Sequence, residues 1–478
     1  MSSVFYELMT TWEIAAVAVT IVLSAYLISN LLAAIVLPPP ERRYERYPRF
    51  PMVSVVLPVY NEPEAIVRAS IASWKAVRYP AFEIIIADDS TEPLELNDPT
   101  VRVIRRTTRE GFKGGALRAL FPQLDPRSEW MVVFDADFHV DPDVLVRFSE
   151  HYQPGVGAVQ GFQAMGRNDP PRWLTRFSES YHVVANALLA GRHRLKGFVG
   201  IQGTVEAYRV EAIRSIGGIA PIATANEDLD TTFRLRKGGW KIVYDPRIIG
   251  RGVAPETYRV FFIQNTRWTA STVREYRRHW GSYLRSRNVP WFEKFDSALF
   301  LLTWTNSLVV TPTLVFLPWA LLSLHLIPLW LSVLITFLPI SLFTLPILTG
   351  ASARLGLIGW MGYYILLVPG YFVMFRATLL GLFTEPGFAR TLKESAPDAS
   401  RSAKAKPSPT ASSPASSFPT MPTGGALQRL VCAHCGRHLN HREVLFYAVG
   451  ALDVRDVTCR KCLGVIERPQ FRGIVASA

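Results

Sequence analysis

The chain has 478 residues, of which 49% are hydrophobic, and its 52 Lys and Arg residues outnumber its 39 Asp and Glu residues to give a net charge of +13. This length suits two or three domains, and the hydrophobic content indicates membrane segments. The basic residues cluster beside these segments. Such a distribution favours an anionic membrane surface or phosphate-bearing substrates over nucleic acid as the binding partner. All four cysteines lie between positions 432 and 462, which excludes a disulfide-stapled fold for the preceding residues and is consistent with a reducing compartment.

The first hydrophobic segment is an uncharged run from Ile14 to Leu37. It is long enough to span a bilayer as a helix, so we expect residues 1–40 to form an N-terminal transmembrane helix. Four arginines follow within positions 41–49 and none precedes the run. By the positive-inside rule, the domain that follows lies in the cytoplasm.

Residues 50–292 alternate short apolar runs with helical patterns. We expect helices at 64–77 and 115–120, and strands at 53–59, 82–87, 101–104, 130–134, 198–205 and 241–244. This succession predicts an α/β domain with a mostly parallel sheet and helices on both faces. The spacing of Gly111, Gly114 and Gly115 does not fit G-x-G-x-x-G, which argues against a dinucleotide-binding site.

Residues 293–385 are mostly apolar and carry few charges, unlike the preceding domain. No Asp, Glu, Lys or Arg occurs from Ser297 to Ala353, and a second uncharged run follows Arg354 and extends to Phe375. Two spans fit the first run, and one span or a hairpin fits the second. We expect transmembrane and interfacial helices here; an odd number of spans would place the tail outside, and an even number inside.

The tail has two predicted parts. Residues 395–425 are rich in Ser, Pro, Ala and Thr, which predicts a disordered linker. Residues 426–478 contain Cys432, Cys435, Cys459 and Cys462, spaced as two C-x₂-C pairs. This spacing predicts a zinc-ribbon-like module with structural Zn²⁺ that binds a protein partner; two disulfides or redox thiols are the alternatives.

The chemistry centres on Asp135 and Asp137, which follow the apolar strand at 130–134. In an α/β sheet, ligands bind beyond the carboxyl ends of the strands. A pair of carboxylates there suits Mg²⁺ or Mn²⁺, which take oxygen ligands and leave positions for substrate phosphates. Taken alone, the pattern is equally well explained by a solvated turn.

Four further motifs have the same dual interpretation. Asp88-Asp89 closes a strand and could bind a nucleotide or only form a turn, and Lys113-Gly114-Gly115 could approach a diphosphate or only form a loop. Asn226 is a predicted N-cap followed by Glu227 and Asp228. The last motif, Gln264-x-x-Arg267-Trp268, could hold a diphosphate and stack on a sugar, or anchor an interfacial helix.

In this order, these motifs resemble those of the membrane-integrated processive glycosyltransferases of family 2, the group of cellulose, hyaluronan, chitin and mannan synthases. The resemblance covers Val53 to about Trp280 and includes Pro58-Val59-Tyr60-Asn61-Glu62 and Gly203-Thr204. It implies a GT-A fold, a nucleotide-diphosphate sugar donor, and a multi-pass protein of the cell inner or plasma membrane with a cytoplasmic catalytic domain.

The resemblance also implies residue roles. Asp88, Asp89, Lys113, Asp135 and Arg267 would bind the donor, and Asp135 with Asp137 the metal. Asp228 would be the general base beside Glu227, while Gln264 and Trp268 would contact the acceptor. Residues 386–394 would form a gating loop, with Phe388, Thr391 and Lys393 as its motif residues.

We expect an inverting hexosyltransferase that transfers sugar, with UDP-hexose as the expected donor, to a growing β-linked polysaccharide and couples this to membrane translocation. A non-processive enzyme that makes a glycolipid of the glycosyl-diacylglycerol type is the alternative, and a catalytically inactive scaffold is a third hypothesis. The chain departs from the family at Asn226, where relatives carry Thr, and around Gln160 and Glu206. These last segments lie near the acceptor in relatives, so the sequence leaves the sugar and the acceptor open.

Overall fold

The computed structural model describes residues 3–38, 50–106, 108–168, 172–221, 224–323, 352–384, 456–458 and 465–467. The chain divides into two compact units, Met1–Glu394 and Ser395–Ala478. In the second unit, strands β9 (Asp456–Thr458) and β10 (Val465–Glu467) pair antiparallel. The expected gating loop, the linker and all four cysteines lie outside the described residues.

The first unit contains an eight-stranded sheet in the order β3-β2-β1-β4-β7-β6-β8-β5. Strands β3, β2, β1 and β4 are parallel neighbours, as are β6 and β8, whereas β7 and β5 run antiparallel to their neighbours. The sheet is therefore mostly parallel, as predicted. Its strands are β1 (Met52–Val59), β2 (Phe82–Asp88), β3 (Val101–Arg105), β4 (Ser128–Val133), β5 (His139–Val140), β6 (Val156–Met165), β7 (Glu206–Arg209) and β8 (Lys241–Gly252).

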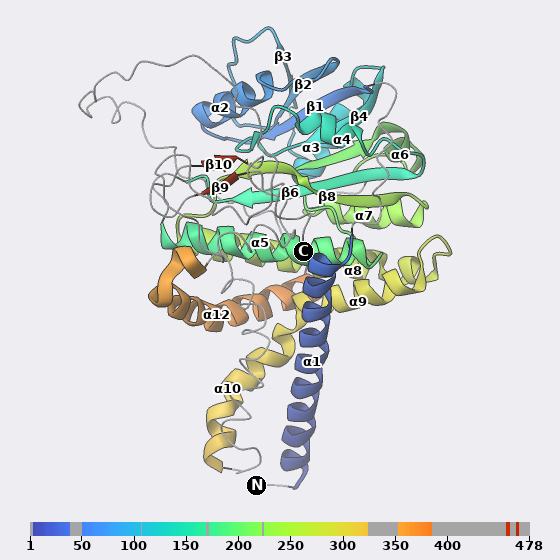
Figure 1. The fold of residues 1–478 in the computed structure, drawn as a ribbon. Coiled ribbons are helices and arrows are strands. Elements are labelled where there is room, and N and C mark those ends of the chain that lie inside the picture. The colour runs from blue at the N-terminus through green and yellow to red at the C-terminus, as the bar shows by residue number, and fades with distance from the viewer. Residues whose placement is uncertain are drawn as a thin grey trace, which may run out of the picture. The chain divides into compact units, whose positions relative to one another are not determined.

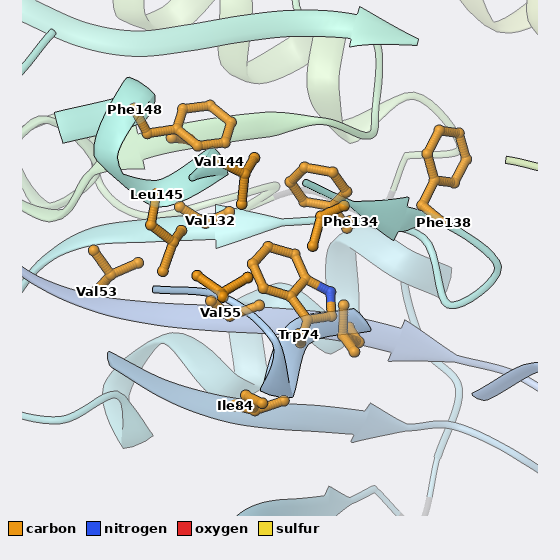
Figure 2. Close-up of a cluster of buried hydrophobic side chains, with 14 of the residues drawn as sticks. Val53, Val55, Trp74, Ile84, Val132, Phe134, Phe138, Val144, Leu145 and Phe148 are labelled. Atoms are coloured by element: carbon orange, nitrogen blue, oxygen red, sulfur yellow. The ribbon is translucent and has the colours of Figure 1, made fainter. Parts of the chain in front are cut away.

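Helices cover both faces of this sheet, because its central strands are apolar on both sides. Val55 and Val56 of β1 point to opposite faces and are both fully buried. On the first face, Trp74 meets Phe134 edge-on with ring centroids 5.0 Å apart (Figure 2). This face packs α2 (Glu64–Lys75) and α4 (Val144–Ser149); the other packs α3 (Phe112–Leu120), α6 (Val210–Ser215) and α7 (Glu227–Lys237).

The remaining helices form a separate layer. These are α1 (Ser3–Val36), α5 (Trp173–Arg194), α8 (Tyr258–Arg285), α9 (Trp291–Thr305), α10 (Ser307–Ser323) and α12 (Ser352–Phe383). Helices α5, α8, α9 and α12 lie crosswise beneath the sheet, while α1 and α10 extend away from it (Figure 1). Among the described residues, one stretch, Trp291–Val315, is long and apolar enough to cross a membrane, and the apolar stretches Ile21–Val36 and Pro369–Phe383 are shorter. The predicted N-terminal helix thus exists, and its crossing of a membrane stays a prediction.

The strand predicted at 198–205 is wrong. These residues form an irregular segment, and the strand of the sheet begins at Glu206. Gly203 adopts a left-handed backbone with φ of +83°, which ends any extended run at this point. The apolar residues Phe198, Val199 and Ile201 are buried beneath the sheet's edge rather than in a strand, so their pattern alone was misleading.

Candidate active site

A cavity of about 570 Å³ lies at the carboxyl ends of β1, β2 and β4 and reaches the helices of the lower layer. Nine predicted site residues line it although they come from distant parts of the chain. They are Asp89, Lys113, Asp135, Asp137, Glu227, Asp228, Gln264, Arg267 and Trp268. The sheet therefore gathers at one edge the motifs that the sequence presents separately.

Lys113 forms the charged centre of the cavity. It lies near the start of α3, and its Nζ donates to Oδ1 of Asp135 at 2.7 Å and to the carbonyl oxygen of Gly203. Oε1 of Glu227 lies 3.9 Å from the same nitrogen. Burial disfavours the charged amine, but the carboxylates of Asp135, Glu227 and Glu206 outweigh burial and raise the pKa of Lys113. The ammonium of Lys113 is thus held charged next to the carboxylates of Asp135 and Glu227.

Asp135 and Asp137 lie together at the exit of β4. The side chain of Asp135 is 40% exposed, and its backbone N–H donates to the Thr204 hydroxyl at 2.9 Å. Asp137 is buried, and its Oδ2 accepts from the Val253 N–H at 3.2 Å. Both carboxylates line the cavity, so they offer the hard oxygen ligands that fit Mg²⁺ or Mn²⁺.

Asp228 lines the cavity beside Glu227, and its surroundings alter its protonation. Burial and the adjacent charge of Glu227 raise the pKa of Asp228 to about 7, with Lys113 acting in the opposite direction. The predicted N-cap holds both acids in place, because Oδ1 of Asn226 accepts from the Leu229 N–H at 3.3 Å. Nδ2 of Asn226 in turn donates to the Ser271 hydroxyl at 3.2 Å, which ties α7 to α8. A carboxylate that titrates near neutrality suits a general base.

The irregular segment that follows Ile201 packs against Asp228 and helps to position it. Gly203 approaches Asp228 so closely that a Cβ there would lie 3.1 Å from Oδ2 of Asp228. Gln160 holds the segment from below: its Oε1 accepts from the Gln202 N–H at 2.8 Å, and its Nε2 donates to the Thr204 carbonyl oxygen at 2.9 Å. Gln160 is completely buried. From the sequence, Gly203 and Gln160 were identified only as residues of motif segments, and neither was expected to position other side chains.

The Gln264–Trp268 motif lies inside α8 rather than in a loop before it. One face of this helix therefore presents Gln264, Arg267 and Trp268 to the cavity. The indole of Trp268 meets the ring of His182 from α5 edge-on, with centroids 6.1 Å apart. Burial lowers the pKa of His182 to about 4, so this imidazole is neutral at physiological pH.

The two predicted nucleotide carboxylates differ in their surroundings. Asp88 does not line the cavity, and its oxygens accept from the Ser90 N–H at 2.9 Å and from Arg105 at 3.0 Å. Asp89 lines the cavity and receives two hydrogen bonds from Arg106, one of 2.7 Å from Nε. Asp88 thus holds the loop that carries Asp89.

The sequence did not predict a role for Arg109, which also lines the cavity. Its guanidinium lies 3.3 Å from the centroid of the Tyr60 ring. Tyr60 belongs to the Pro58–Glu62 motif at the end of β1. The arginine lies between β3 and the Lys113 motif but belongs to neither, so no sequence signal marked it as a residue of the site.

A second acidic group lies outside the cavity. Ligand atoms of Asp230, Glu275 and His279 are all within 4.8 Å of one another. Cations already neutralise them, because Asp230 accepts from Arg234 at 2.8 Å and Glu275 from Arg278 at 3.1 Å. We interpret the group as a hydrogen-bonded network that joins α7 to α8.

Comparison with known proteins agrees with this geometry. Residues 48–271 match the model of a family described as Glycosyltransferase like family 2. The chain is 29% identical over 326 residues to a probable glucomannan 4-beta-mannosyltransferase 1 of Arabidopsis thaliana, covering 62% of this chain and 57% of that protein. It is 28% identical over 270 residues to glucomannan 4-beta-mannosyltransferase 1 of Cyamopsis tetragonoloba, covering 52% of this chain and 50% of that protein. The chain thus spans about half the length of the curated relatives it matches.

A solved structure resembles the fold. A mannosyltransferase from Pyrobaculum calidifontis, in complex with GDP-Man and Mn²⁺, aligns with a TM-score of 0.52 at 18% identity, covering 77% of this chain and 99% of that one. The likeness supports the predicted GT-A-like arrangement. Residues 48–271 are thus similar to a glycosyltransferase family 2 domain.

Proposed function

We propose that this protein is an inverting, metal-dependent hexosyltransferase that extends a β-linked glycan. The observation that carries the proposal is the single cavity in which Lys113, Asp135 and Asp137 face Glu227, Asp228 and Arg267. Acidic metal ligands, cations for a diphosphate and a base that titrates near neutrality are the groups that transfer from a nucleotide-diphosphate sugar needs.

In the proposed reaction, ionised Asp228 accepts the proton of the acceptor hydroxyl. The acceptor oxygen then attacks the anomeric carbon from the side opposite the diphosphate, and the bond to the diphosphate oxygen breaks, which inverts the configuration. Arg267 and Lys113 stabilise the charge that develops on the departing nucleoside diphosphate. General base catalysis of this kind contributes a factor of roughly 10² to 10⁴ to the rate.

Asp135 and Asp137 would hold the divalent cation through those carboxylate oxygens that face the cavity. Bound there, Mg²⁺ or Mn²⁺ would supply charge neutralisation for the diphosphate. The chain prepares this site by burying Asp137 against the Val253 N–H and by leaving Asp135 partly exposed. Trp268 and Gln264 would bind the acceptor at the opposite wall.

The relatives bear on the donor sugar. Those reported above are described as glucomannan mannosyltransferases, and the similar solved structure contains GDP-Man. Both favour GDP-mannose over the UDP-hexose that we expected from the sequence. We therefore propose GDP-mannose as the first donor to test, and a β-mannan or glucomannan chain as the product.

The test is transfer by membranes containing the protein, supplied with Mn²⁺ and radiolabelled GDP-mannose or UDP-hexoses. We expect label from GDP-mannose in an ethanol precipitate that a β-mannanase degrades. Label in the organic phase would instead make the protein a glycolipid-forming enzyme. Absence of transfer from every donor, together with an unchanged phenotype of an Asp228→Asn strain, would support the scaffold hypothesis and overturn the proposal.

The tail supports a separate proposal. In the sequence, Cys459 and Cys462 fall between β9 and β10, two strands that pair antiparallel. We infer that the pair binds structural Zn²⁺ together with Cys432 and Cys435. Elemental analysis of the purified protein should find one zinc per chain, and a Cys459→Ser/Cys462→Ser variant should lose it.

A further inference from the structure

A second cavity, of about 490 Å³, lies between α8 and α12, and of its lining residues only Arg267 has a role in the proposed sugar transfer. Small and apolar side chains make up most of its wall, with three arginines among them. The lining residues are Ala225, Arg259, Phe262, Ile263, Thr266, Arg267, Ala270, Ser271, Val373, Arg376 and Leu380. We call this cavity the α8/α12 groove.

The helical repeat explains how the groove is built. On α8, residues three or four positions apart line it from Arg259 to Ala270, and on α12 the same spacing runs from Val373 to Leu380. The two helices approach closely at Gly381, where a Cβ would lie 2.6 Å from the Ala270 carbonyl oxygen. Beyond that point Arg274 donates to the Thr384 carbonyl oxygen. The groove is therefore narrow at this end and widens toward Arg259 and Arg376.

The two arginines at the wide end of the groove have no acidic partner among the described residues. Arg259 and Arg376 are both exposed, and neither forms a hydrogen bond or ion pair with any residue that the structure describes. Below them the wall is apolar, formed by Phe262, Ile263 and Val373. Two free guanidinium groups above an apolar wall are complementary to an anion that carries a hydrocarbon chain.

The surroundings of the groove indicate which amphiphile this is. Tyr258, beside Arg259, is 51% exposed. Beyond the other end of α8, Trp291 begins the apolar stretch Trp291–Val315 and is 77% exposed. Tyr and Trp side chains concentrate where a membrane meets water, and arginines there attract anionic lipids. The groove lies between helices of the same layer as this apolar stretch.

We propose that the α8/α12 groove binds the phosphate headgroup of an anionic phospholipid, with Arg259 and Arg376 on the phosphate and an acyl chain along Phe262, Ile263 and Val373. Guanidinium groups bind phosphate oxygens through paired, charge-assisted hydrogen bonds.

The groove and the active-site cavity share part of their walls, so a ligand in the groove affects sugar transfer. Arg267, Ser271, Phe262 and Ala225 line both the groove and the active-site cavity. A lipid in the groove packs against the face of α8 that presents Arg267 to the donor, so it favours the arrangement that binds the diphosphate. Anionic lipid therefore activates transfer. This readout rests on the proposed function, whereas lipid binding does not.

The experiment uses the full-length protein in nanodiscs of phosphatidylcholine, alone or mixed with phosphatidylglycerol. Native mass spectrometry measures retained phosphatidylglycerol, and the transfer assay measures its effect on rate. We expect the wild type to retain the anionic lipid and to transfer faster with it. The double variant Arg259→Gln/Arg376→Gln should keep the rate of the phosphatidylcholine discs but bind phosphatidylglycerol roughly tenfold or more weakly.

The matched control is Arg285→Gln/Arg287→Gln, which removes the same charge from exposed positions at the other end of α8. It should respond to phosphatidylglycerol as the wild type does, and soluble glycerol phosphate should not replace the lipid. Equal lipid retention by both double variants would overturn the proposal. A wild type indifferent to phosphatidylglycerol, with basal activity lost in Arg259→Gln/Arg376→Gln, would point to another occupant and also overturn it. Lipid retention without any transfer would refute only the proposed function.

Discussion

Nζ of Lys113, at the start of α3, donates to Oδ1 of Asp135, at the exit of β4, over 2.7 Å. One oxygen of the proposed metal ligand is therefore bonded to a cation of the chain itself. The same ammonium lies 3.9 Å from Glu227, so it also adjoins the acid that precedes the proposed base. Lys113 thus connects the donor-binding and acceptor-activating sides of the cavity.

Replacing Lys113 by Met should weaken donor binding more than it weakens the fold. The change leaves Asp135 and Glu227 without their common cation and removes a charge that faces the diphosphate, so we expect the Kd for GDP-mannose to rise by roughly 10- to 100-fold. Titration calorimetry with Mn²⁺ present measures this. Lys75→Met is the matched control, because it removes the same charge from a surface ion pair with Asp98 of 2.6 Å, outside the cavity, and surface ion pairs contribute little to stability. Equal donor affinities in the two variants would contradict the role of Lys113.

The rate should depend on the ionisation of Asp228. Because burial and Glu227 raise its pKa to about 7, and because a base must be unprotonated, kcat/KM should rise with pH through about 7 and then level off. Glu227→Gln removes a negative charge beside Asp228 and should move this acid limb to lower pH. Asp228→Asn should lower the rate by roughly 10² to 10⁴. A wild-type limb that lies below pH 5 would argue against Asp228 as the base.

The Asp137→Asn variant should bind the metal ion more weakly but still fold. The buried carboxylate loses its charge but keeps the shape that accepts from the Val253 N–H. Losing a direct ligand should lower Mn²⁺ affinity by more than the roughly 10- to 100-fold that loss of an outer partner costs. Activity titrated against Mn²⁺ after EDTA treatment gives the affinity. Asp98→Asn, a change of the same charge outside the cavity, should leave the titration unchanged.

The parts of the fold that sequence reasoning predicted correctly depend on strong local patterns. The strands that became β1 and β2 are mostly apolar runs, and acids follow the strand exits and the helix cap. That Asp135, Asp137 and Asp228 belong to one site was predicted by the family resemblance, not by these local patterns. The common cavity confirms that these residues lie together, and their chemical roles stay predictions.

The parts that were missed depend on contacts between distant segments. Residues 198–205 have the apolar pattern of a strand, but hydrogen bonds from Gln160 and a left-handed Gly203 hold them as an irregular segment. Arg106, which follows β3, pairs with Asp89, which follows β2, and Arg109 covers Tyr60. No periodicity or motif marks such residues, because their importance comes from tertiary contacts alone.

Gly203→Ala should impair both stability and catalysis. At φ of +83° a Cβ costs roughly 1–2 kcal/mol, and this Cβ would also lie 3.1 Å from Oδ2 of Asp228. The contact has to displace the carboxylate or the segment that accepts the Lys113 hydrogen bond. We therefore expect a lower melting temperature together with a reduced kcat and a shifted acid limb.

Gly217→Ala provides the control for this effect. Gly217 has a similar φ of +81°, and a Cβ there would meet nothing within 4 Å. This variant should lose a comparable amount of stability by thermal unfolding but keep the kcat and the pH profile of the wild type. If Gly217→Ala reduced kcat as much as Gly203→Ala, the loss would follow from general destabilisation. The proposed positioning of Asp228 by Gly203 would then be wrong.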